Sequence, residues 1–191
     1  MNCLITGASG FVGLALTKEL LRAGHHITNL ARNPHPELEK IKVKTLRWDL
    51  GLLPEISELN DSIPSHQELV DTLKNVSVIY HVASKVSMWG RWEEFYHTNY
   101  LGTKKLLTLA KHFKIPYFIY TSTPSVVFGN QAIENGDESV NYPKKYYSYY
   151  AKSKAMAETL VLTANNPQAN FYTLALRPHL IFGANDPHLI P

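Results

Sequence analysis

The sequence is poor in cysteine and has no long apolar run. Cys3 is the only cysteine among 191 residues, which excludes an internal disulfide framework and a cysteine-rich zinc site. No apolar stretch approaches the roughly 18 residues of a membrane-spanning helix. The first residues carry no basic segment, and Gly7, Gly10 and Gly13 interrupt the apolar core that a signal peptide needs. We therefore expect a protein of the reducing cytoplasm without a membrane span.

Charge of one sign is not concentrated anywhere in the chain. The 19 Lys and Arg alternate with 16 Asp and Glu, for a net charge of +3. The densest basic cluster, Lys40, Lys42, Lys44 and Arg47, alternates along an expected strand and is typical of a solvated face. Nucleic acid is therefore not expected as a partner. The nine histidines lack metal-ligand spacing, so we expect no metal site.

Short β-rich runs alternate with longer helical patterns along the chain. We expect strands at 3–6, 27–30, 43–46, 76–82, 117–121 and 171–176, and helices at 11–23, 67–74, 92–113 and 149–162. Residues 52–65 hold two prolines without a clear period and are expected to form a surface loop. This alternation predicts a parallel sheet with crossover helices, built as one domain, 1–191.

A glycine-rich turn stands between the first expected strand and the first expected helix. Gly7, Gly10 and Gly13 follow the spacing G-x-x-G-x-x-G. One glycine of such a turn permits the sharp bend, one lets a pyrophosphate approach the main chain, and one lets the helix pack on the strand. The N–H groups at the helix start then attract phosphate. The turn therefore indicates a dinucleotide site, with a tight turn that binds nothing as the alternative.

Two Tyr-x-x-x-Lys pairs occur, Tyr100 with Lys104 and Tyr150 with Lys154. The motif alone decides nothing, because about one such pair is expected by chance from this composition. Tyr150 begins a helical pattern after the fifth expected strand, whereas Tyr100 lies on the preceding long helix as a packed residue. Residues four apart share a helix face, so we expect the Lys154 ammonium to lower the pKa of Tyr150. A phenol tuned in this way can exchange a proton with a substrate oxygen.

The motifs together resemble those of the extended short-chain dehydrogenase/reductase superfamily. The segments that carry the resemblance follow in the superfamily's order, at 6–13, 81–84, 97–103, 120–129, 153–158 and 176–183. Within the superfamily, the wording is similar to the 3β-hydroxysteroid dehydrogenase-like branch, which includes 2-alkyl-3-oxoalkanoate reductases. The resemblance implies a doubly wound parallel α/β sheet of the Rossmann type that binds NAD(P).

The resemblance also implies a role for individual residues. Tyr150 would protonate the nascent alkoxide, and Lys154 would tune Tyr150 and bind the nicotinamide ribose. Thr123 would hydrogen-bond the carbonyl oxygen, and Asn99 would support the site. Thr123 stands where the family usually has serine, which leaves Ser122 open as the alternative hydroxyl. The residues implied to contact the cofactor are Gly7, Ser9, Gly10, Phe11, Val12, Gly13, Arg32, Asp49, Leu50, Val82, Ala83, Ser84, Tyr150, Lys154 and Pro178.

The end of the second expected strand bears on the choice of cofactor. An acidic residue there would bind the ribose 2′-OH of NAD. Residues 29–33 contain no acid, and Arg32 is placed to pair with a 2′-phosphate. This favours NADP(H) and leaves NAD(H) open, with a surface arginine of no role as the alternative.

The activity so implied is the interconversion of a secondary alcohol and a ketone on an apolar, sterol-like or long-chain 3-oxo substrate. A nucleotide-sugar epimerase or dehydratase and a non-catalytic NAD(P)-binding module stay as alternatives. Members of the superfamily continue into a C-terminal lobe that builds the substrate pocket, and this sequence stops at Pro191. We therefore expect cofactor binding with poor catalysis, and apolar surface near Phe182 and Leu189 that favours a homodimer.

Overall fold

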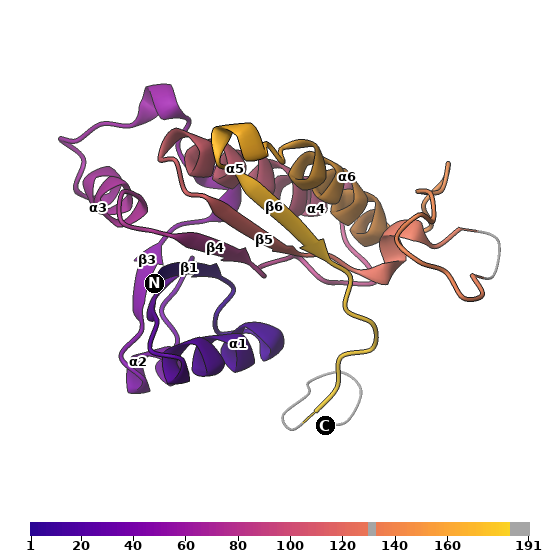
Figure 1. Ribbon diagram of the computed structural model, residues 1–191, viewed down its shortest axis with the longest axis horizontal. Coiled ribbons are helices and arrows are strands. Elements are labelled where there is room, and N and C mark those ends of the chain that lie inside the picture. The colour runs from indigo at the N-terminus through magenta and orange to yellow at the C-terminus, as the bar shows by residue number, and fades with distance from the viewer. Residues whose placement is uncertain (130–132, 184–191) are drawn as a thin grey trace.

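Six parallel strands form the sheet that the alternating pattern predicts. The computed structural model describes residues 1–129 and 133–183 (Figure 1). Its strands are β1 (Asn2–Thr6), β2 (His26–Ala31), β3 (Lys44–Arg47), β4 (Val78–His81), β5 (Tyr117–Thr121) and β6 (Tyr172–Leu176). Their order is β3-β2-β1-β4-β5-β6, and every neighbouring pair is parallel. The chain changes direction across the sheet between β1 and β4, which is where ligands bind in doubly wound folds.

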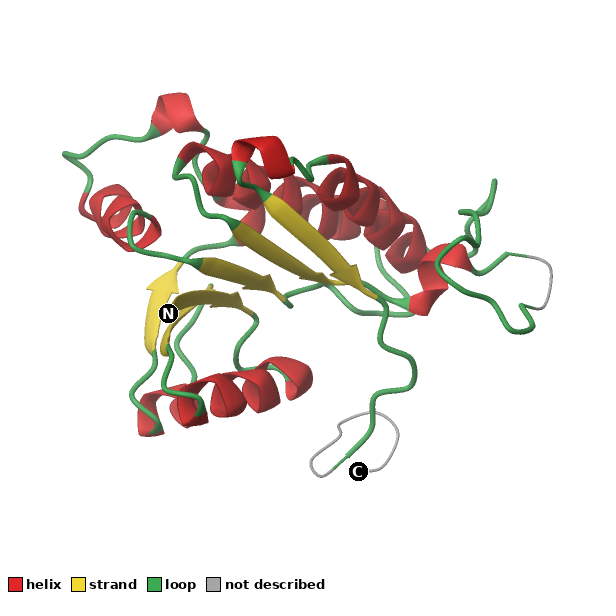
Figure 2. Cartoon of the chain, in the orientation of Figure 1, coloured by secondary structure: helices red, strands yellow, loops and turns green. Residues whose placement is uncertain are grey.

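Helices cover the two faces of the sheet unequally. They are α1 (Phe11–Arg22), α2 (Pro36–Lys40), α3 (Pro64–Leu73), α4 (Trp92–Phe95), α5 (Gly102–His112) and α6 (Tyr149–Thr163). Figure 2 shows α1 and α2 below the sheet at its β1–β3 end, and α5 and α6 above its β4–β6 end. The doubly wound parallel sheet predicted from the motifs is therefore confirmed.

Two predicted segments differ in detail from the structure. The single helix expected at 92–113 is interrupted by a π-helical turn at Tyr96–Leu101, which the regular pattern on either side conceals. The expected loop at 52–65 ends in α3, which starts at Pro64 because proline is well suited to the first turn of a helix.

The apolar core forms two layers, one on each face of the sheet, and the layer on the α1 side contains no buried residue of β5 or β6. The larger cluster lies between the sheet and α3, α5 and α6, and includes Leu4, Ile79 and Phe118. The smaller cluster, which includes Ile5 and Val78, lies on the α1 side. We call the α1-side surface of β5 and β6 the bare face, because no described helix covers it. It consists of Tyr117, Ile119, Tyr172, Leu174 and Leu176.

The apolar surface expected near the end of the sequence is described only in part. Phe182 is exposed, with 65% of its surface accessible, while Leu189 lies outside the described residues. The bare face adds exposed apolar side chains that the sequence did not reveal, because no local pattern records which face of an edge strand is covered. Tyr172, Leu174 and Leu176 are each 40–49% exposed.

Candidate active site

The glycine turn after β1 has two positions fixed by packing and one open position. Gly7 has φ +73°, and a Cβ there would come within 2.8 Å of the Ala83 main chain. A Cβ on Gly13 would collide with the carbonyl oxygen of Gly7. A Cβ on Gly10 would meet only that oxygen, at 3.4 Å. Gly10 therefore leaves space beside the start of α1, as the approach of a phosphate requires.

The start of α1 is suited to an anion. Gly10 caps the helix without a side-chain hydrogen bond, and the first turn, with Phe11 and Val12, contains no acidic residue. The positive end of the helix dipole is therefore left uncompensated by the helix itself. Asn29 holds the turn from below, since its fully buried side chain accepts a hydrogen bond from Ala8 N at 3.3 Å. Sequence reasoning missed Asn29, although an amide in the middle of an apolar strand is a usable signal.

A cavity of about 380 Å³ lies beside the turn, at the carboxyl ends of β1, β2 and β4. Six residues predicted to contact the cofactor line it, namely Gly7, Arg32, Asp49, Leu50, Ala83 and Ser84. The prediction did not include Trp48, Lys85, Val86 and Thr98, which line the same cavity. Among the other predicted residues, Ser9 lies in the glycine turn, Val82 directly follows β4, and Pro178 comes two residues after β6. These three do not line this cavity.

Tyr150 lies at the start of α6, beside hydroxyl groups from two strand ends. Burial raises the pKa of Tyr150, and the hydroxyls of Thr123 and Ser84 partly oppose that rise. The Ser84 hydroxyl is buried and has no hydrogen-bond partner among the described residues. The structure thus brings together Tyr150, Thr123 and Ser84, with a raised rather than a lowered phenol pKa.

The expectation that the pKa of Tyr150 lies below its usual value is wrong for this arrangement, because burial raises it. The Lys154 ammonium donates a hydrogen bond to the Thr121 main-chain oxygen at 2.6 Å and lies 4.1 Å from the centre of the Tyr120 ring. It is 1% exposed. Burial lowers the pKa of Lys154 to about 7, and the charge of Glu158 acts in the opposite direction. Desolvation is therefore the main cause of the pKa shifts of both Tyr150 and Lys154.

The two candidate hydroxyls at the end of β5 face different partners. Thr123 Oγ1 accepts a hydrogen bond from Ser125 N at 3.3 Å and caps the 3-10 turn Pro124–Val127. Thr123 also acts on Tyr150, whereas the buried Ser122 hydroxyl lies near Glu158 and helps to lower its pKa. The Ser122 hydroxyl makes no hydrogen bond of normal geometry with the described residues. The geometry thus favours Thr123 over Ser122 as the partner of Tyr150.

Asn99 ties three segments together around this group. Its Nδ2 donates to Ser153 Oγ at 2.9 Å and to the Lys85 main-chain oxygen at 3.1 Å, and its Oδ1 accepts from Lys85 N at 2.7 Å. Ser153 Oγ in turn donates to the Tyr150 main-chain oxygen at 2.9 Å. The π-helical turn that carries Asn99 therefore supports the Tyr150 end of α6 through direct hydrogen bonds.

A buried histidine at the start of the 81–84 segment, for which no role was predicted, links the end of β1 to α5. His81 bonds Thr6 Oγ1 at 2.7 Å through Nδ1 and Thr103 Oγ1 at 2.8 Å through Nε2. Burial lowers the pKa of His81 to about 3, with the Lys154 charge as a smaller cause, so the imidazole is neutral at physiological pH. Ala83 N also donates to Thr6 Oγ1, at 3.1 Å. This network fixes the ends of β1 and β4, where the cavity begins.

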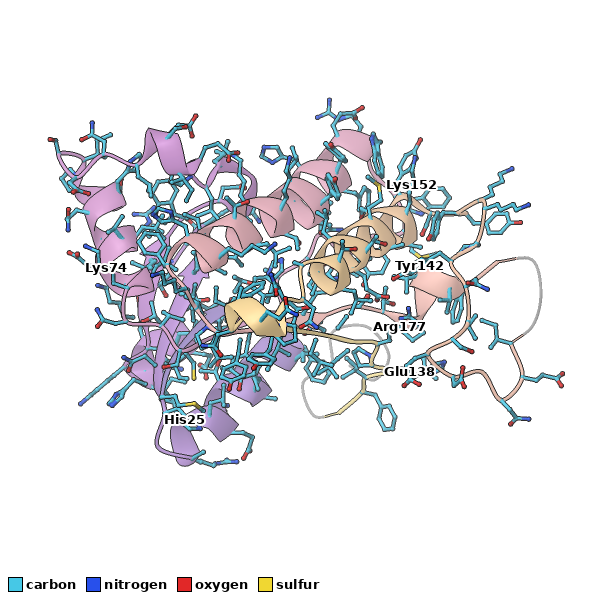
Figure 3. All side chains as sticks on the ribbon, turned by 45° about the horizontal axis from the view of Figure 1, so that its top comes forward. His25, Lys74, Glu138, Tyr142, Lys152 and Arg177 are labelled. Atoms are coloured by element: carbon cyan, nitrogen blue, oxygen red, sulfur yellow. The ribbon has the colours of Figure 1, made fainter. Side chains whose placement is uncertain are left out.

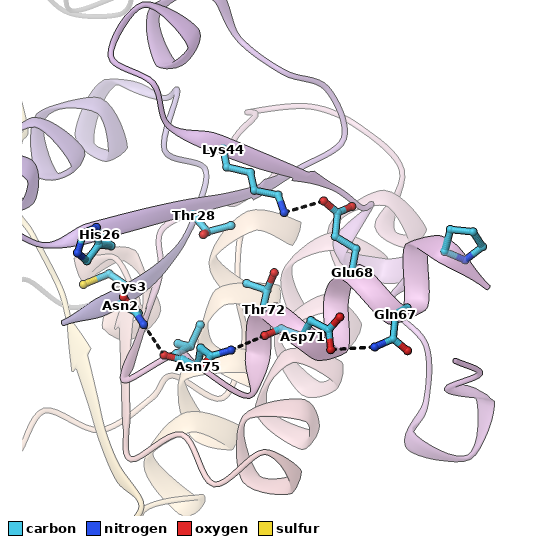
Figure 4. A pocket seen from close by; sticks show the side chains of 12 residues that line it. Asn2, Cys3, His26, Thr28, Lys44, Gln67, Glu68, Asp71, Thr72 and Asn75 are labelled. Atoms are coloured by element: carbon cyan, nitrogen blue, oxygen red, sulfur yellow. Dashed lines mark hydrogen bonds and ion pairs between the residues drawn. The ribbon is translucent and has the colours of Figure 1, made fainter. Parts of the chain in front are cut away.

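A larger cavity, of about 620 Å³, lies at the opposite end of the strands (Figure 4). Its polar side chains pair with one another, since Lys44 binds Glu68 at 2.8 Å and Gln67 donates to Asp71 at 2.8 Å. No predicted site residue lines it. A binding site needs polar groups that converge on a ligand, so the cavity beside the glycine turn is the better candidate.

The described part of the chain contains neither a metal-ligand cluster nor a helix that could span a membrane. Residues 1–129 and 133–183 contain no group of three or more His, Cys, Asp or Glu side chains that could hold a metal ion. No helix in these ranges is long and apolar enough to cross a membrane.

Comparison with known proteins agrees with the site that the geometry indicates. The model of the 3-beta hydroxysteroid dehydrogenase/isomerase family matches residues 4–191. The chain is 36% identical over 195 residues to 2-alkyl-3-oxoalkanoate reductase of Shewanella oneidensis, covering 100% of this chain and 47% of that protein. It is 35% identical over 190 residues to the decarboxylating sterol-4-alpha-carboxylate 3-dehydrogenase of Homo sapiens, with the same coverage, 100% and 47%. The chain spans about half the length of the curated relatives it matches.

A solved structure shows the same architecture. MoeE5, in complex with UDP-glucose and NAD, matches with a TM-score of 0.70 and 28% identity, over 93% of this chain and 54% of that one.

Proposed function

The chain belongs to the 3-beta hydroxysteroid dehydrogenase/isomerase family, and from this premise we propose that it is an NAD(P)-binding domain, 1–191, for alcohol–ketone chemistry. The observation that carries the proposal is the grouping of Tyr150, Thr123 and Ser84 at one end of the site whose other end is the glycine turn. The open position at Gly10 and the unpartnered Ser84 hydroxyl fit a dinucleotide laid along the ends of β1 and β4.

The proposed proton transfer runs from Tyr150 to the substrate. When bound, NAD(P)H supplies the hydride that reduces the carbonyl carbon. Thr123 donates a hydrogen bond to the carbonyl oxygen, and Tyr150 gives its phenolic proton to that oxygen as negative charge develops there. The raised pKa of Tyr150 keeps the phenol protonated, which suits the direction of ketone reduction. The charge of Lys154 stabilises the tyrosinate that remains.

We place the substrate among apolar ketones and alcohols. The support comes from two relatives, whose names give a 2-alkyl-3-oxoalkanoate and a sterol 4α-carboxylate as the compounds on which they act. A nucleotide sugar is the rival substrate, supported by the UDP-glucose in the MoeE5 complex. Turnover of UDP-glucose without turnover of a long-chain 3-oxo compound would decide for the rival.

Replacement of one hydroxyl tests the reaction. Tyr150→Phe should lower kcat by about 10²- to 10⁴-fold, because it removes the proton donor, and should leave cofactor affinity nearly unchanged. Tyr100→Phe is the matched control, since Tyr100 packs against Tyr96 with ring centres 5.0 Å apart. Turnover is measured as NAD(P)H oxidation with a 3-oxo substrate, and affinity as NAD(P)H fluorescence. Activity kept by Tyr150→Phe and lost by Tyr100→Phe would refute the assignment.

For the cofactor, we propose a preference for NADP(H). Exposed Arg32 lines the cavity beside the glycine turn together with Asp49, whose carboxylate accepts a hydrogen bond from Gly51 N at 2.9 Å. Arg32→Ala should weaken NADP(H) binding about tenfold, near 1.4 kcal/mol, and leave NAD(H) binding unchanged. Equal losses for both cofactors would show that Arg32 does not read the 2′-phosphate.

We further propose a homodimer in the cytoplasm. The dimer is supported by the bare face, whose apolar side chains would leave water on self-association. The location is supported by the single cysteine, Cys3, which is a buried free thiol. Analytical ultracentrifugation over a range of concentrations tests the dimer.

A further inference from the structure

A buried carboxylate lies one helical turn beyond Lys154 on α6. Glu158 follows Lys154 by four residues, as Lys154 follows Tyr150, so the three share one face of the helix. Glu158 is fully buried. Arg177, the first residue after β6, donates to both of its oxygens at 2.6–3.2 Å. Tyr142, in the segment before α6, donates to the same carboxylate at 2.6 Å. The Arg177 guanidinium lies 5.7 Å from the centre of the Tyr142 ring, and Figure 3 labels both side chains.

This carboxylate stays ionised in spite of its burial. Burial pushes the pKa of Glu158 upward, but the hydrogen bonds from Arg177 and Tyr142, together with the nearby Ser122 hydroxyl, prevail and lower it below the usual 4.5. A charge buried in this way is costly unless it is paired and fully hydrogen-bonded. Arg177 and Tyr142 provide that pairing and hydrogen bonding, from the segment after β6 and from the segment before α6.

Glu158 is the charged group that Lys154 faces at neutral pH. The titratable groups around the ammonium are Tyr150 and Glu158 on α6, Tyr120 on β5 and His81 on β4. Both tyrosines have a raised pKa, and His81 has a pKa of about 3, so these three are neutral. The ammonium's hydrogen bond goes to the uncharged main chain of Thr121. The compensating charge therefore comes from Glu158.

We propose that Glu158 is a positioning residue that keeps Lys154 protonated inside the protein, and that Arg177 and Tyr142 hold its carboxylate in place. The purpose of this arrangement rests on the proposed function, in which charged Lys154 stabilises the Tyr150 tyrosinate. Its existence does not, because the protonation of Lys154 can be measured without turnover. Loss of the Glu158 charge should leave Lys154 mostly neutral at pH 7, since its pKa is already about 7 with that charge present.

The experiment is a pH titration of Lys154 by NMR in the full chain, with ¹³C-labelled lysine and the signal assigned by its loss in Lys154→Arg. In Glu158→Gln the pKa of Lys154 should fall by about 1 pH unit or more. The matched control is Glu19→Gln, which removes an exposed carboxylate on α1 that pairs with Arg22. An unchanged Lys154 pKa in folded Glu158→Gln would overturn the proposal, because a structural pair alone would not move it.

A second variant guards against loss of folding. Glu158→Gln combined with Arg177→Gln removes both charges of the pair and leaves neither unpaired, which buried pairs tolerate far better than single removal. The pKa of Lys154 should again fall, because Glu158 is the carboxylate that raises it. An unchanged value in the double variant would also overturn the proposal.

Kinetics separate this proposal from the proposed function. Where the chain turns over substrate, the alkaline limb of its pH–rate profile should move to lower pH in Glu158→Gln, together with the Lys154 titration. A shift of the titration in a chain that binds neither NADH nor NADPH would refute the proposed function and support the role of Glu158. A shift of neither refutes the role of Glu158 alone.

Discussion

The two ends of the sheet are held together by different physics. At the β1–β3 end, helices cover both faces, and the buried polar groups are neutral and hydrogen-bonded, as with Asn29 and Thr6. At the β5–β6 end, helices cover one face, and the interior beneath α6 holds three charged side chains, Lys154, Glu158 and Arg177. Close packing therefore determines which substitutions the first end tolerates. At the second end, the balance of buried charges determines it.

This difference matches the division of labour in the proposed reaction. A dinucleotide is bound largely by main-chain groups, so its end of the sheet needs close approach and rigid packing. A proton donor needs neighbouring charges that shift its pKa, so the other end needs ionised groups in a low-dielectric interior. Substitutions at the two ends should consequently fail in different ways, through steric overlap at one and through uncompensated charge at the other.

The largest effect is expected from breaking the buried ion pair. Arg177→Leu leaves the fully buried Glu158 carboxylate without its cation, which should destabilise the protein by about 3–5 kcal/mol. Urea unfolding at pH 7, followed by circular dichroism, measures the loss. The control is Arg22→Leu, which breaks the exposed pair with Glu19 and should cost less than 1 kcal/mol. Equal losses in the two variants would remove the electrostatic distinction between the ends.

The pH dependence of this variant should have the opposite sign to that of the parent chain. In the parent, the folded-state pKa of Glu158 is lowered, so its contribution is present above about pH 4.5 and lost as the pH falls through the folded pKa. In Arg177→Leu, burial is left as the dominant influence and raises that pKa. The stability that remains is then lost as the pH rises through the raised folded pKa. The deficit of the variant should thus be smaller at pH 4.5 than at pH 7.

A smaller effect is expected from a methyl group placed in the glycine turn. Gly13→Ala puts a Cβ into the Gly7 carbonyl oxygen and should cost about 1–3 kcal/mol. Gly10→Ala is the matched substitution, because its Cβ meets only that oxygen at 3.4 Å, and it should cost less than about 1 kcal/mol. For cofactor binding, by contrast, the proposed site predicts that Gly10→Ala clearly lowers NAD(P)H affinity although this variant keeps a stable fold. Retained affinity would indicate a turn that binds no phosphate.

The fold could be predicted closely because its signals are local. Strand β5 occupies the predicted residues 117–121, and α6 extends one residue beyond the predicted 149–162. The π-helical turn at Tyr96–Leu101 could not be predicted, since one extra residue leaves the apolar pattern on both sides intact. Helix α2, Pro36–Lys40, was also missed, because five residues are too few to show a period.

The candidate site could be predicted residue by residue, but its electrostatics could not. The motifs located Tyr150, Thr123 and Asn99, which the structure brings to one region. The direction of the Tyr150 pKa was predicted wrongly, because the spacing of Lys154 gives no information about desolvation. The role of Glu158, which lies in the motif at 153–158, could not be predicted, because its partner Arg177 lies on a different element and is brought near only by the fold.

The smallest effect on stability is expected at the bare face, where the comparison can be sharpened through association. Leu174 is 49% exposed at the centre of this face, opposite Ile119, so Leu174→Thr should change the free energy of unfolding by no more than about 0.5 kcal/mol. Its effect should be on self-association, because it replaces an apolar contact of the proposed dimer with a hydroxyl. Leu162→Thr is the matched control, since Leu162 is 46% exposed on α6, away from this face. Sedimentation velocity should show a weaker dimer for Leu174→Thr alone. Equal weakening by both substitutions would point to general surface hydrophobicity. No change in association for Leu174→Thr would mean that something other than a second copy of the chain covers the bare face.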